Sequence, residues 1–168
     1  MELNHILKDI EITPELLERT NPVFQTAKFT LYQLAASGDL YAGKIVKILG
    51  LTDETQGAKG AEKIRPEMLI CNFLMMETRF RGMMQYALDM GVKNFVDLPC
   101  GYTPRSLMMS EQGIHFTGCD LPAVVEEFSS VIDKIASPEQ KKYIRYCSVD
   151  ATNYQSLRKA FEGIDGEV

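Results

Sequence analysis

Hydrophobic and polar positions change their period near the middle of this chain of 168 residues. Up to about residue 90, apolar residues recur with the three-to-four-residue spacing of amphipathic helices. From Val92 onward, short apolar runs alternate with segments of helical period. The pattern predicts a helical region over 1–90, which would form a cap or lid, and an α/β region over 91–168.

Capping residues, prolines and glycines set the helix boundaries in the first region. These signals predict four helices, which begin near Pro14, Pro22, Leu40 and Pro66. The second is expected to end near Gly38, the third at Gly50 and the fourth at Gly91. A polar loop over 52–60 separates the third helix from the fourth.

The long helix that begins at Pro66 is rich in methionine. Its methionines are Met68, Met75, Met76, Met83, Met84 and Met90. Because methionine is flexible and apolar, it commonly fills irregular gaps in a core. We therefore expect these side chains to pack in the core, with a methionine-rich ligand surface as the alternative.

Three apolar runs in the second region have the composition of β-strands. They read NFVDL, HFTGCDL and YIRYCSVD, and helical segments over 104–112, 123–136 and 154–161 follow them in turn. This order predicts parallel strands joined by right-handed crossovers. The expected fold class is therefore α/β, a doubly wound sheet that binds its ligand at the carboxyl ends of the strands.

Composition excludes several classes of function. A hydrophobic content of 45% with 24% charged residues is typical of a globular protein. The net charge of −5, without a cluster of lysine and arginine, argues against a nucleic-acid partner. The chain has no apolar stretch of membrane-spanning length and no signal-peptide pattern at its start. We therefore expect a cytoplasmic protein with no membrane partner.

The four cysteines, Cys71, Cys100, Cys119 and Cys147, lack the short spacing of zinc ligands. Three of them lie at predicted strand ends, where they could converge in space. Since free cysteine behaves as a small hydrophobic residue, we expect buried reduced thiols and no metal.

Acidic residues stand at the ends of all three predicted strands: Asp97, Asp120 and Asp150. A carboxylate in this place suits a ribose hydroxyl or an adenine amino group. The turn after the first strand has one glycine, Gly101, and neither a dinucleotide nor a Walker motif. Pro104 also removes a backbone N–H that a phosphate would need. These features favour an adenosine ligand without phosphate, and make a nicotinamide-dependent oxidoreductase the weaker choice.

This ordered set of motifs resembles the class I S-adenosylmethionine-dependent methyltransferases, and most closely the leucine carboxyl methyltransferase family. The turn LPCGYTPR corresponds to the family's DLGCGTG or LGAGLDTR, CDLP to the end of its second strand, and SVDA to the acidic position after its third. The resemblance covers about residues 65–160. It implies a Rossmann-like fold, S-adenosyl-L-methionine as cofactor, and an enzyme that O-methylates a carboxylate or a hydroxyl of a small molecule or a protein.

The resemblance implies a cofactor site of nine residues: Arg79, Asp97, Cys100, Gly101, Arg105, Asp120, Leu121, Asp150 and Ala151. Asp120 would accept hydrogen bonds from the ribose, Leu121 would pack on the adenine, and Asp150 with the N–H of Ala151 would meet the adenine edge. Arg79, or Arg81 beside it, would hold the methionine carboxylate. The turn departs from the family pattern because Pro99 replaces its first glycine and Thr103 its last.

Each charged candidate also has a structural alternative. Asp97 could support the turn, whereas Asp120 and Asp150 could each cap the helix that follows. Arg79 could be a solvated helix residue, and Arg105 could pair with a core carboxylate. A non-catalytic adenosine-binding or protein-interaction module is therefore the alternative function.

No catalytic base is assigned, and a carboxylate acceptor, already ionised at pH 7, needs none. The class I sheet has seven strands, and three are predicted here. We therefore expect the N-terminal part of a longer protein, or a second chain that pairs with the open edge of the first strand. A homo-oligomer formed through that edge is one form of the second expectation.

Overall fold

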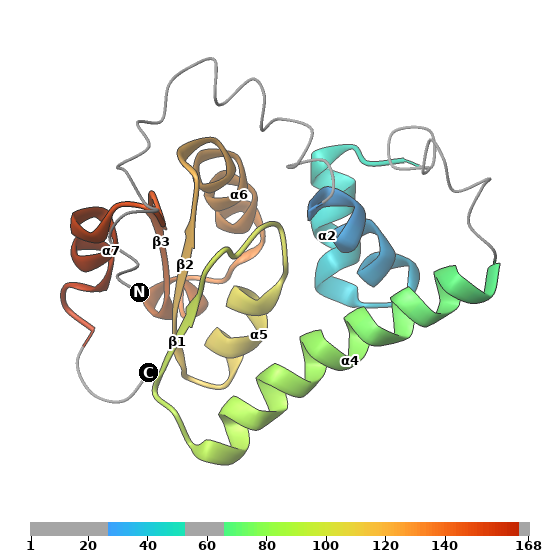
Figure 1. Cartoon of the computed structure of the whole chain (residues 1–168), viewed down its shortest axis with the longest axis horizontal. Helices are drawn as coiled ribbons and strands as arrows, with labels where there is room; N and C mark the ends of the chain where they lie inside the picture. Colours follow the sequence, from blue (N-terminus) through green and yellow to red (C-terminus); the bar gives the residue numbers. More distant parts are fainter. Residues whose placement is uncertain (1–26, 53–65, 165–168) are drawn as a thin grey trace, which may run out of the picture.

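The computed structural model describes residues 27–52 and 66–164, without the side chains at positions 66, 68, 69, 72 and 73. The helix expected at Pro14, the start of the helix at Pro22 and most of the polar loop lie outside these ranges. So does the side chain of Met68. Figure 1 shows a small sheet with helices on both of its faces and a long helix that leads into its first strand.

The helical region follows the boundaries that the sequence predicts. A helix over 27–36 precedes α2 (Leu40–Leu49), and α4 spans Pro66–Met90. The Asp39 carboxylate accepts the N–H of Ala42 at 2.8 Å and caps α2. Gly50, with φ 63°, ends α2 in the left-handed conformation that glycine adopts without strain.

The core position that we expected for the methionines of α4 is confirmed for Met84 and wrong for Met75, Met83 and Met90, which are exposed. Among its described side chains, α4 buries only Phe80, Met84 and Ala87. These three positions share one face of the helix because they are spaced by three and four residues. Helix α4 therefore contacts the body of the protein along a narrow face.

Three parallel strands form the sheet, as predicted. They are β1 (Asn94–Asp97), β2 (His115–Asp120) and β3 (Ile144–Ser148), in the spatial order β1-β2-β3. The connections are α5 (Arg105–Glu111), then α6 (Pro122–Ile135) with the short 3₁₀ helix η3 (Gln140–Tyr143), and α7 (Tyr154–Phe161) follows β3.

Side chains of the strands alternate between two hydrophobic clusters. Phe116 and Tyr146 pack with residues of α5 and α6, whereas Cys119 and Cys147 pack with Ala160 of α7. This alternation is the two-residue period of a β-strand that is covered on both faces. Helices α5 and α6 therefore lie on one face and α7 on the other (Figure 1). The expected Rossmann-like α/β arrangement is present in these three strands.

A single core joins the helical region to the sheet. Leu31 and Ile45 belong to the same buried cluster as Phe128 of α6 and Phe116 of β2. Burial of such side chains stabilises each by about 1.5–3 kcal/mol. The helical region is thus part of the body of the protein.

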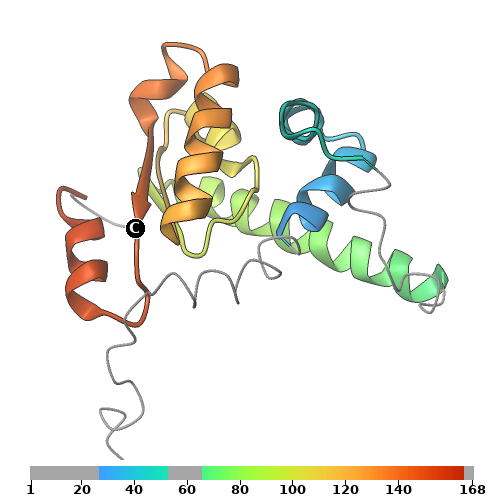
Figure 2. The ribbon, with the colours of Figure 1, turned by 90° about the horizontal axis from the view of Figure 1, so that it is seen from above.

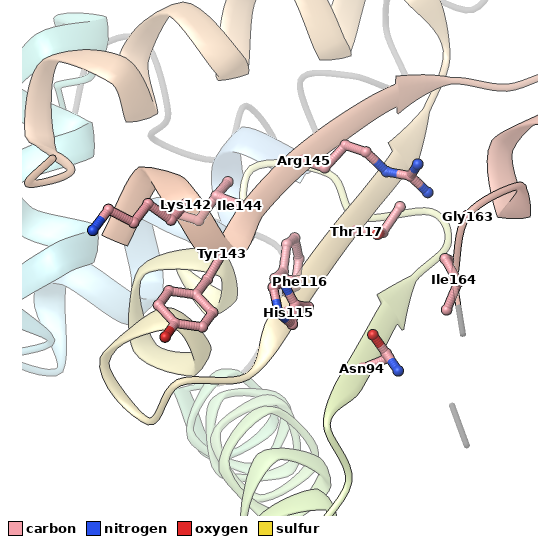
Figure 3. A pocket seen from close by; sticks show the side chains of 10 residues that line it. All are labelled: Asn94, His115, Phe116, Thr117, Lys142, Tyr143, Ile144, Arg145, Gly163 and Ile164. Atoms are coloured by element: carbon pink, nitrogen blue, oxygen red, sulfur yellow. The ribbon is translucent and has the colours of Figure 1, made fainter. Parts of the chain in front are cut away.

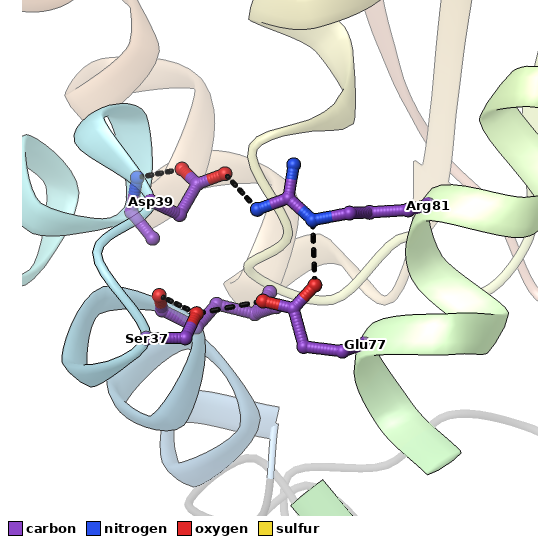
Figure 4. A network of polar contacts seen from close by, with 6 residues as sticks. Ser37, Asp39, Glu77 and Arg81 are labelled. Atoms are coloured by element: carbon purple, nitrogen blue, oxygen red, sulfur yellow. Dashed lines mark hydrogen bonds and ion pairs between the residues drawn. The ribbon is translucent and has the colours of Figure 1, made fainter. Parts of the chain in front are cut away.

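A polar network joins the first helices to α4 (Figure 4). Glu77 lies 2.6 Å from the Ser37 hydroxyl and 2.7 Å from Arg81 Nε, and Arg81 Nη2 is 3.7 Å from the capping carboxylate of Asp39. Burial opposes ionisation of Glu77, but the hydrogen bonds from Ser37 and Arg81 outweigh it and lower the pKa of Glu77.

The lowered pKa of Glu77 makes stability depend on pH. This contribution is fully present above the ordinary pKa of glutamate and is lost as pH falls through the lowered folded-state pKa. Urea unfolding at a series of pH values should show an acid-side loss that shrinks in Glu77→Gln, by about 1 kcal/mol or less. Glu126→Gln, at an exposed position of α6, should keep the wild-type slope. Equal slopes in both variants would contradict the assignment.

Gly118 in the middle of β2 has no space for a side chain. A Cβ at this position would lie 2.5 Å from Cε1 of Tyr146. We predict that Gly118→Ala lowers the free energy of unfolding by about 1–3 kcal/mol, measured by urea denaturation. Gly43→Ala in α2, where no atom lies within 4 Å, should instead raise it by about 0.5–1 kcal/mol. A stable Gly118→Ala protein would show that the ring of Tyr146 does not pack there.

Candidate functional site

The turn after β1 is tied to the end of β2. The N–H of Cys100 donates to the carbonyl of Cys119 at 3.0 Å, which extends the contact between the two strands past Asp97. Gly101 then adopts φ 52°, a left-handed conformation that favours glycine. The backbone conformation of this turn therefore explains why its one glycine stands at position 101.

The carboxylate of Asp120, the last residue of β2, is hydrogen-bonded to this turn. Its Oδ2 accepts the N–H of Gly101 and its Oδ1 accepts the N–H of Leu121, each at 2.8 Å. The residue is only 8% exposed. Leu121 occupies the N-cap position of α6 without a side-chain cap, so Asp120 does not cap that helix. It instead joins two segments that are nineteen residues apart.

Asp97 and Arg105 form an ion pair beside the turn, which is the structural alternative that we gave for Arg105. Nη1 of Arg105 lies 2.8 and 3.0 Å from the two carboxylate oxygens, and its guanidinium lies 5.0 Å from the ring centre of Phe80. Burial raises the pKa of Asp97 and the charge of Asp120 adds to this, although Arg105 opposes the shift. Nε of Arg105 is buried without a partner among the described residues.

Asp150 stabilises its own turn after β3. Its Oδ1 accepts from the N–H and the hydroxyl of Thr152, at 2.9 and 2.6 Å, and its N–H donates to Ser156 Oγ at 3.0 Å. Asn153 is the residue that caps α7. Because the three strands are parallel, Asp150 lies at the same edge of the sheet as Asp97 and Asp120. Ala151, next to it, is exposed.

Arg79 lies at an exposed position of α4, and none of the contacts described above joins it to this group. The structure instead brings the start of helix 27–36 to the turn, which sequence reasoning missed. Lys28 Nζ lies 2.8 Å from Glu127 and 5.0 Å from the ring centre of Tyr102, whose hydroxyl donates to Glu127. No local pattern signals a pair that is 99 residues apart in the chain.

Our expectation of buried thiols is wrong for Cys71 and confirmed for Cys100 and Cys119. Cys71 is exposed and Cys147 is half-buried, whereas Cys100 and Cys119 are buried free thiols. Burial raises the pKa of Cys119 to about 11. Within the ranges that the structure describes, no three His, Cys, Asp or Glu residues are grouped to hold a metal ion.

A cavity of 380 Å³ lies at the opposite, amino-terminal edge of the sheet (Figure 3). Asn94, His115 and Ile144, at the starts of the three strands, line it. Arg145, which also lines it, donates to the carbonyls of Ala160 and Glu162 at 2.6 and 3.2 Å. This cavity and the carboxylate edge are therefore two separate places on the molecule.

Comparison with known proteins gives no relative: no family model, curated protein or solved structure matches this chain. The fold defines an α/β protein with an open, parallel, Rossmann-like sheet. Among the described helices, none has the length and apolar character needed to cross a bilayer.

Substitution of Asp120 and of Asp150 by asparagine should affect stability differently. Asp120 uses both oxygens as acceptors, so Asn leaves one backbone N–H facing an amide NH₂, which should cost about 1–3 kcal/mol of unfolding free energy. Asp150 uses one oxygen for both bonds, so Asn can keep them and stability should change little. Urea denaturation of both variants checks this, and equal losses would contradict the role of Asp120.

Proposed function

We propose that this chain binds S-adenosyl-L-methionine at the carboxyl edge of its sheet and serves methyl transfer to a carboxylate or hydroxyl. The observation that carries the proposal is the buried carboxylate of Asp120 beside the Gly101 turn, where the first two parallel strands end. Open α/β sheets bind their ligands in this place, outside the carboxyl ends of the strands.

The charges at this edge suit a cation better than a phosphate. Asp97, Asp120 and Asp150 bring three carboxylates to it, and Arg105 is the one cation paired with them in the described part of the chain. An anion placed here would be repelled, whereas a sulfonium would be attracted. These carboxylates therefore fit S-adenosyl-L-methionine and fit a dinucleotide poorly.

Enough acceptor capacity remains for a ribose. A carboxylate has about four lone-pair positions, and Asp120 uses one on each oxygen for a backbone N–H. Asp120 would therefore hold the two ribose hydroxyls, Leu121 would pack on the adenine, and Asp150 with the N–H of Ala151 would bind the adenine edge. Cys100 and Gly101 would shape the site, because their N–H groups already bind Cys119 and Asp120.

The methionine carboxylate needs a cation. Of the two arginines that the sequence offered, Arg81 pairs with Glu77 and Asp39. Arg79 is exposed, so it stays the candidate for this role. Arg105 would support the turn through Asp97.

Bound S-adenosyl-L-methionine would supply an electrophilic methyl group on sulfur. The residues of this chain would fix its orientation and exclude water, which can lower the barrier of a displacement by several kcal/mol. His115 lies at the amino edge and cannot act as a base at the other edge, and the second histidine, His5, lies outside the described residues. A carboxylate acceptor, ionised without a base, therefore suits the site.

Binding without turnover is the second candidate function. It is favoured by the contacts of Asp120 with Gly101 and Leu121, which hold the turn and leave acceptor capacity for a ribose without supplying a group that reacts. A regulatory adenosine-binding module would need nothing further at this edge.

Calorimetric titration with S-adenosylhomocysteine tests the proposal. We expect micromolar binding to the wild-type chain, weakened about 10- to 100-fold in Asp120→Ala because charge-assisted hydrogen bonds to the ribose are lost. Asp133→Asn, at an exposed position of α6, is the matched control and should bind as the wild type does. Circular dichroism shows whether each variant is folded.

Unchanged affinity in a folded Asp120→Ala protein, or no binding to the folded wild type, would contradict the cofactor site. If binding is found, transfer of a labelled methyl group to carboxylate and hydroxyl acceptors separates the enzyme from the binding module.

A further inference from the structure

A row of polar side chains crosses one face of the sheet near its amino-terminal edge. Asn94 of β1, Thr117 of β2 and Arg145 of β3 form this row, and all three line the cavity of 380 Å³. Thr117 and Arg145 are partners in the register of β2 and β3. Asn94 stands two residues before Val96, the partner of Thr117, so it lies on the same face. We call Asn94, Thr117 and Arg145 the polar row.

Two residues further along each strand, the same face becomes apolar. Val96, Cys119 and Cys147 occupy those positions and belong to the cluster that includes Leu157 and Ala160 of α7. Strands of a parallel sheet that is covered on both faces are usually apolar along their whole length. Helix α7 therefore covers the carboxyl half of this face, whereas the amino half carries the polar row and borders the cavity.

Figure 3 shows how the polar row faces the rest of the cavity. Its three side chains project from their strands toward the side on which Gly163 and Ile164 stand, just beyond α7. His115 and Tyr143 form another wall, and their ring centres are 5.0 Å apart. Polar groups of three strands thus converge on one space with aromatic and aliphatic walls, which is the usual composition of a small-molecule site.

The hydroxyl of Thr117 has no hydrogen-bond partner within the ranges that the structure describes, although the residue is only 6% exposed. A buried hydroxyl is normally hydrogen-bonded, because leaving it unpaired costs about 1–3 kcal/mol. Since Thr117 lines the cavity, the partner of its hydroxyl has to come from a molecule in the cavity.

Arg145 brings a positive charge and unused donors to the cavity. Its Nη1 and Nη2 donate to the carbonyls of Glu162 and Ala160, at 3.2 and 2.6 Å. A guanidinium has five N–H donors, so three remain. In the described part of the chain, no carboxylate pairs with Arg145 and no acidic residue lines the cavity. Lys142, which also lines it, pairs with Glu139 at 2.5 Å, so the unpaired charge of the cavity is that of Arg145.

We propose that this cavity binds the phosphate group of a small molecule, which the polar row holds. The amide of Asn94, the hydroxyl of Thr117 and the guanidinium of Arg145 are all hydrogen-bond donors. The planar fork of arginine matches the geometry of phosphate oxygens. The cavity volume of 380 Å³ lies within the range of about 300–1,000 Å³ that is typical of small-molecule sites. It therefore holds more of the ligand than the phosphate alone.

A phosphate suits the polar row better than a carboxylate does. One donor comes from each of the three strands, and a phosphate group presents three terminal oxygens where a carboxylate presents two. A phosphate also carries about −1.5 to −2 charges at neutral pH. Its attraction to Arg145 is therefore stronger than that of a carboxylate, which carries a single charge.

This site is independent of the function proposed above. It lies at the amino-terminal edge of the sheet, whereas Asp120 and Gly101 lie at the carboxyl edge. S-adenosylhomocysteine carries no phosphate. Asp120→Ala should therefore leave phosphate binding unchanged, and Thr117→Val should leave the binding of S-adenosylhomocysteine unchanged.

NMR titration of the full chain with inorganic phosphate is the first test. Sodium chloride keeps the ionic strength constant, so that a general salt effect does not contribute. We expect saturable shifts of the amides of Thr117, Arg145 and Ile164, and none at Gly101. Titration with acetate under the same conditions should give weaker binding, because acetate has one charge and two oxygens.

Two variants identify the groups that hold the phosphate. Thr117→Val removes the hydroxyl and keeps the branched shape, and should weaken phosphate binding about 10-fold. Because this hydroxyl has no partner among the described residues, the variant should be as stable as the wild type. Arg145→Gln should weaken binding by at least about 10-fold. Arg158→Gln removes the same charge from an exposed position of α7 that does not line the cavity, and should bind as the wild type does.

Three results would overturn the proposal. The absence of saturable shifts at the cavity in the folded wild type would exclude a phosphate site. Wild-type affinity in a folded Thr117→Val protein would show that the polar row does not hold the anion. Tighter binding of acetate than of phosphate would assign the cavity to a carboxylate. Circular dichroism and urea denaturation establish that each variant is folded.

Discussion

The structure depends on one buried carboxylate that joins two strand ends. Asp120 accepts the N–H groups of Gly101 and Leu121, so it fixes the turn after β1 and the entry into α6 at the same time. The bond from Cys100 to the carbonyl of Cys119 holds the same two segments together. Burial of a carboxylate costs free energy unless its oxygens accept hydrogen bonds, so the positions of the Gly101 and Leu121 N–H groups around Asp120 are strongly constrained. The shape of the carboxyl edge follows from it.

The sequence predicted the elements and their order well, because their signals are local. Asp39 and Gly50 bound α2, and the Pro66 and Gly91 signals bound α4. It also predicted which strand ends carry carboxylates, since parallel strands end at one edge. It could not predict that Asp120 accepts the N–H of Gly101, or that Lys28 pairs with Glu127, because these partners lie 19 and 99 residues apart in the chain. The methionines of α4 were misplaced because a helix that is apolar on two sides does not reveal which side meets the body.

Helix α4 joins the helical region to the carboxyl edge of the sheet, and Figure 2 shows it extending past helix 27–36 as one long rod. One face carries Phe80, which supports Arg105 and through it the carboxylate of Asp97. The network of Glu77 and Arg81 anchors the first helices to the same α-helix, and their start lies over the Gly101 turn. Helix α4 therefore fixes the first helices and the turn relative to each other by packing.

The central claim is that adenosine binds at the carboxyl edge held by Asp120, and an NMR map of amide shifts tests it most directly. Titration with S-adenosylhomocysteine should shift the amides of Gly101, Leu121 and Ala151, and leave those of His115 and Ile144 at the amino-edge cavity unchanged. Shifts confined to the amino edge, or none at saturating ligand, would contradict the account.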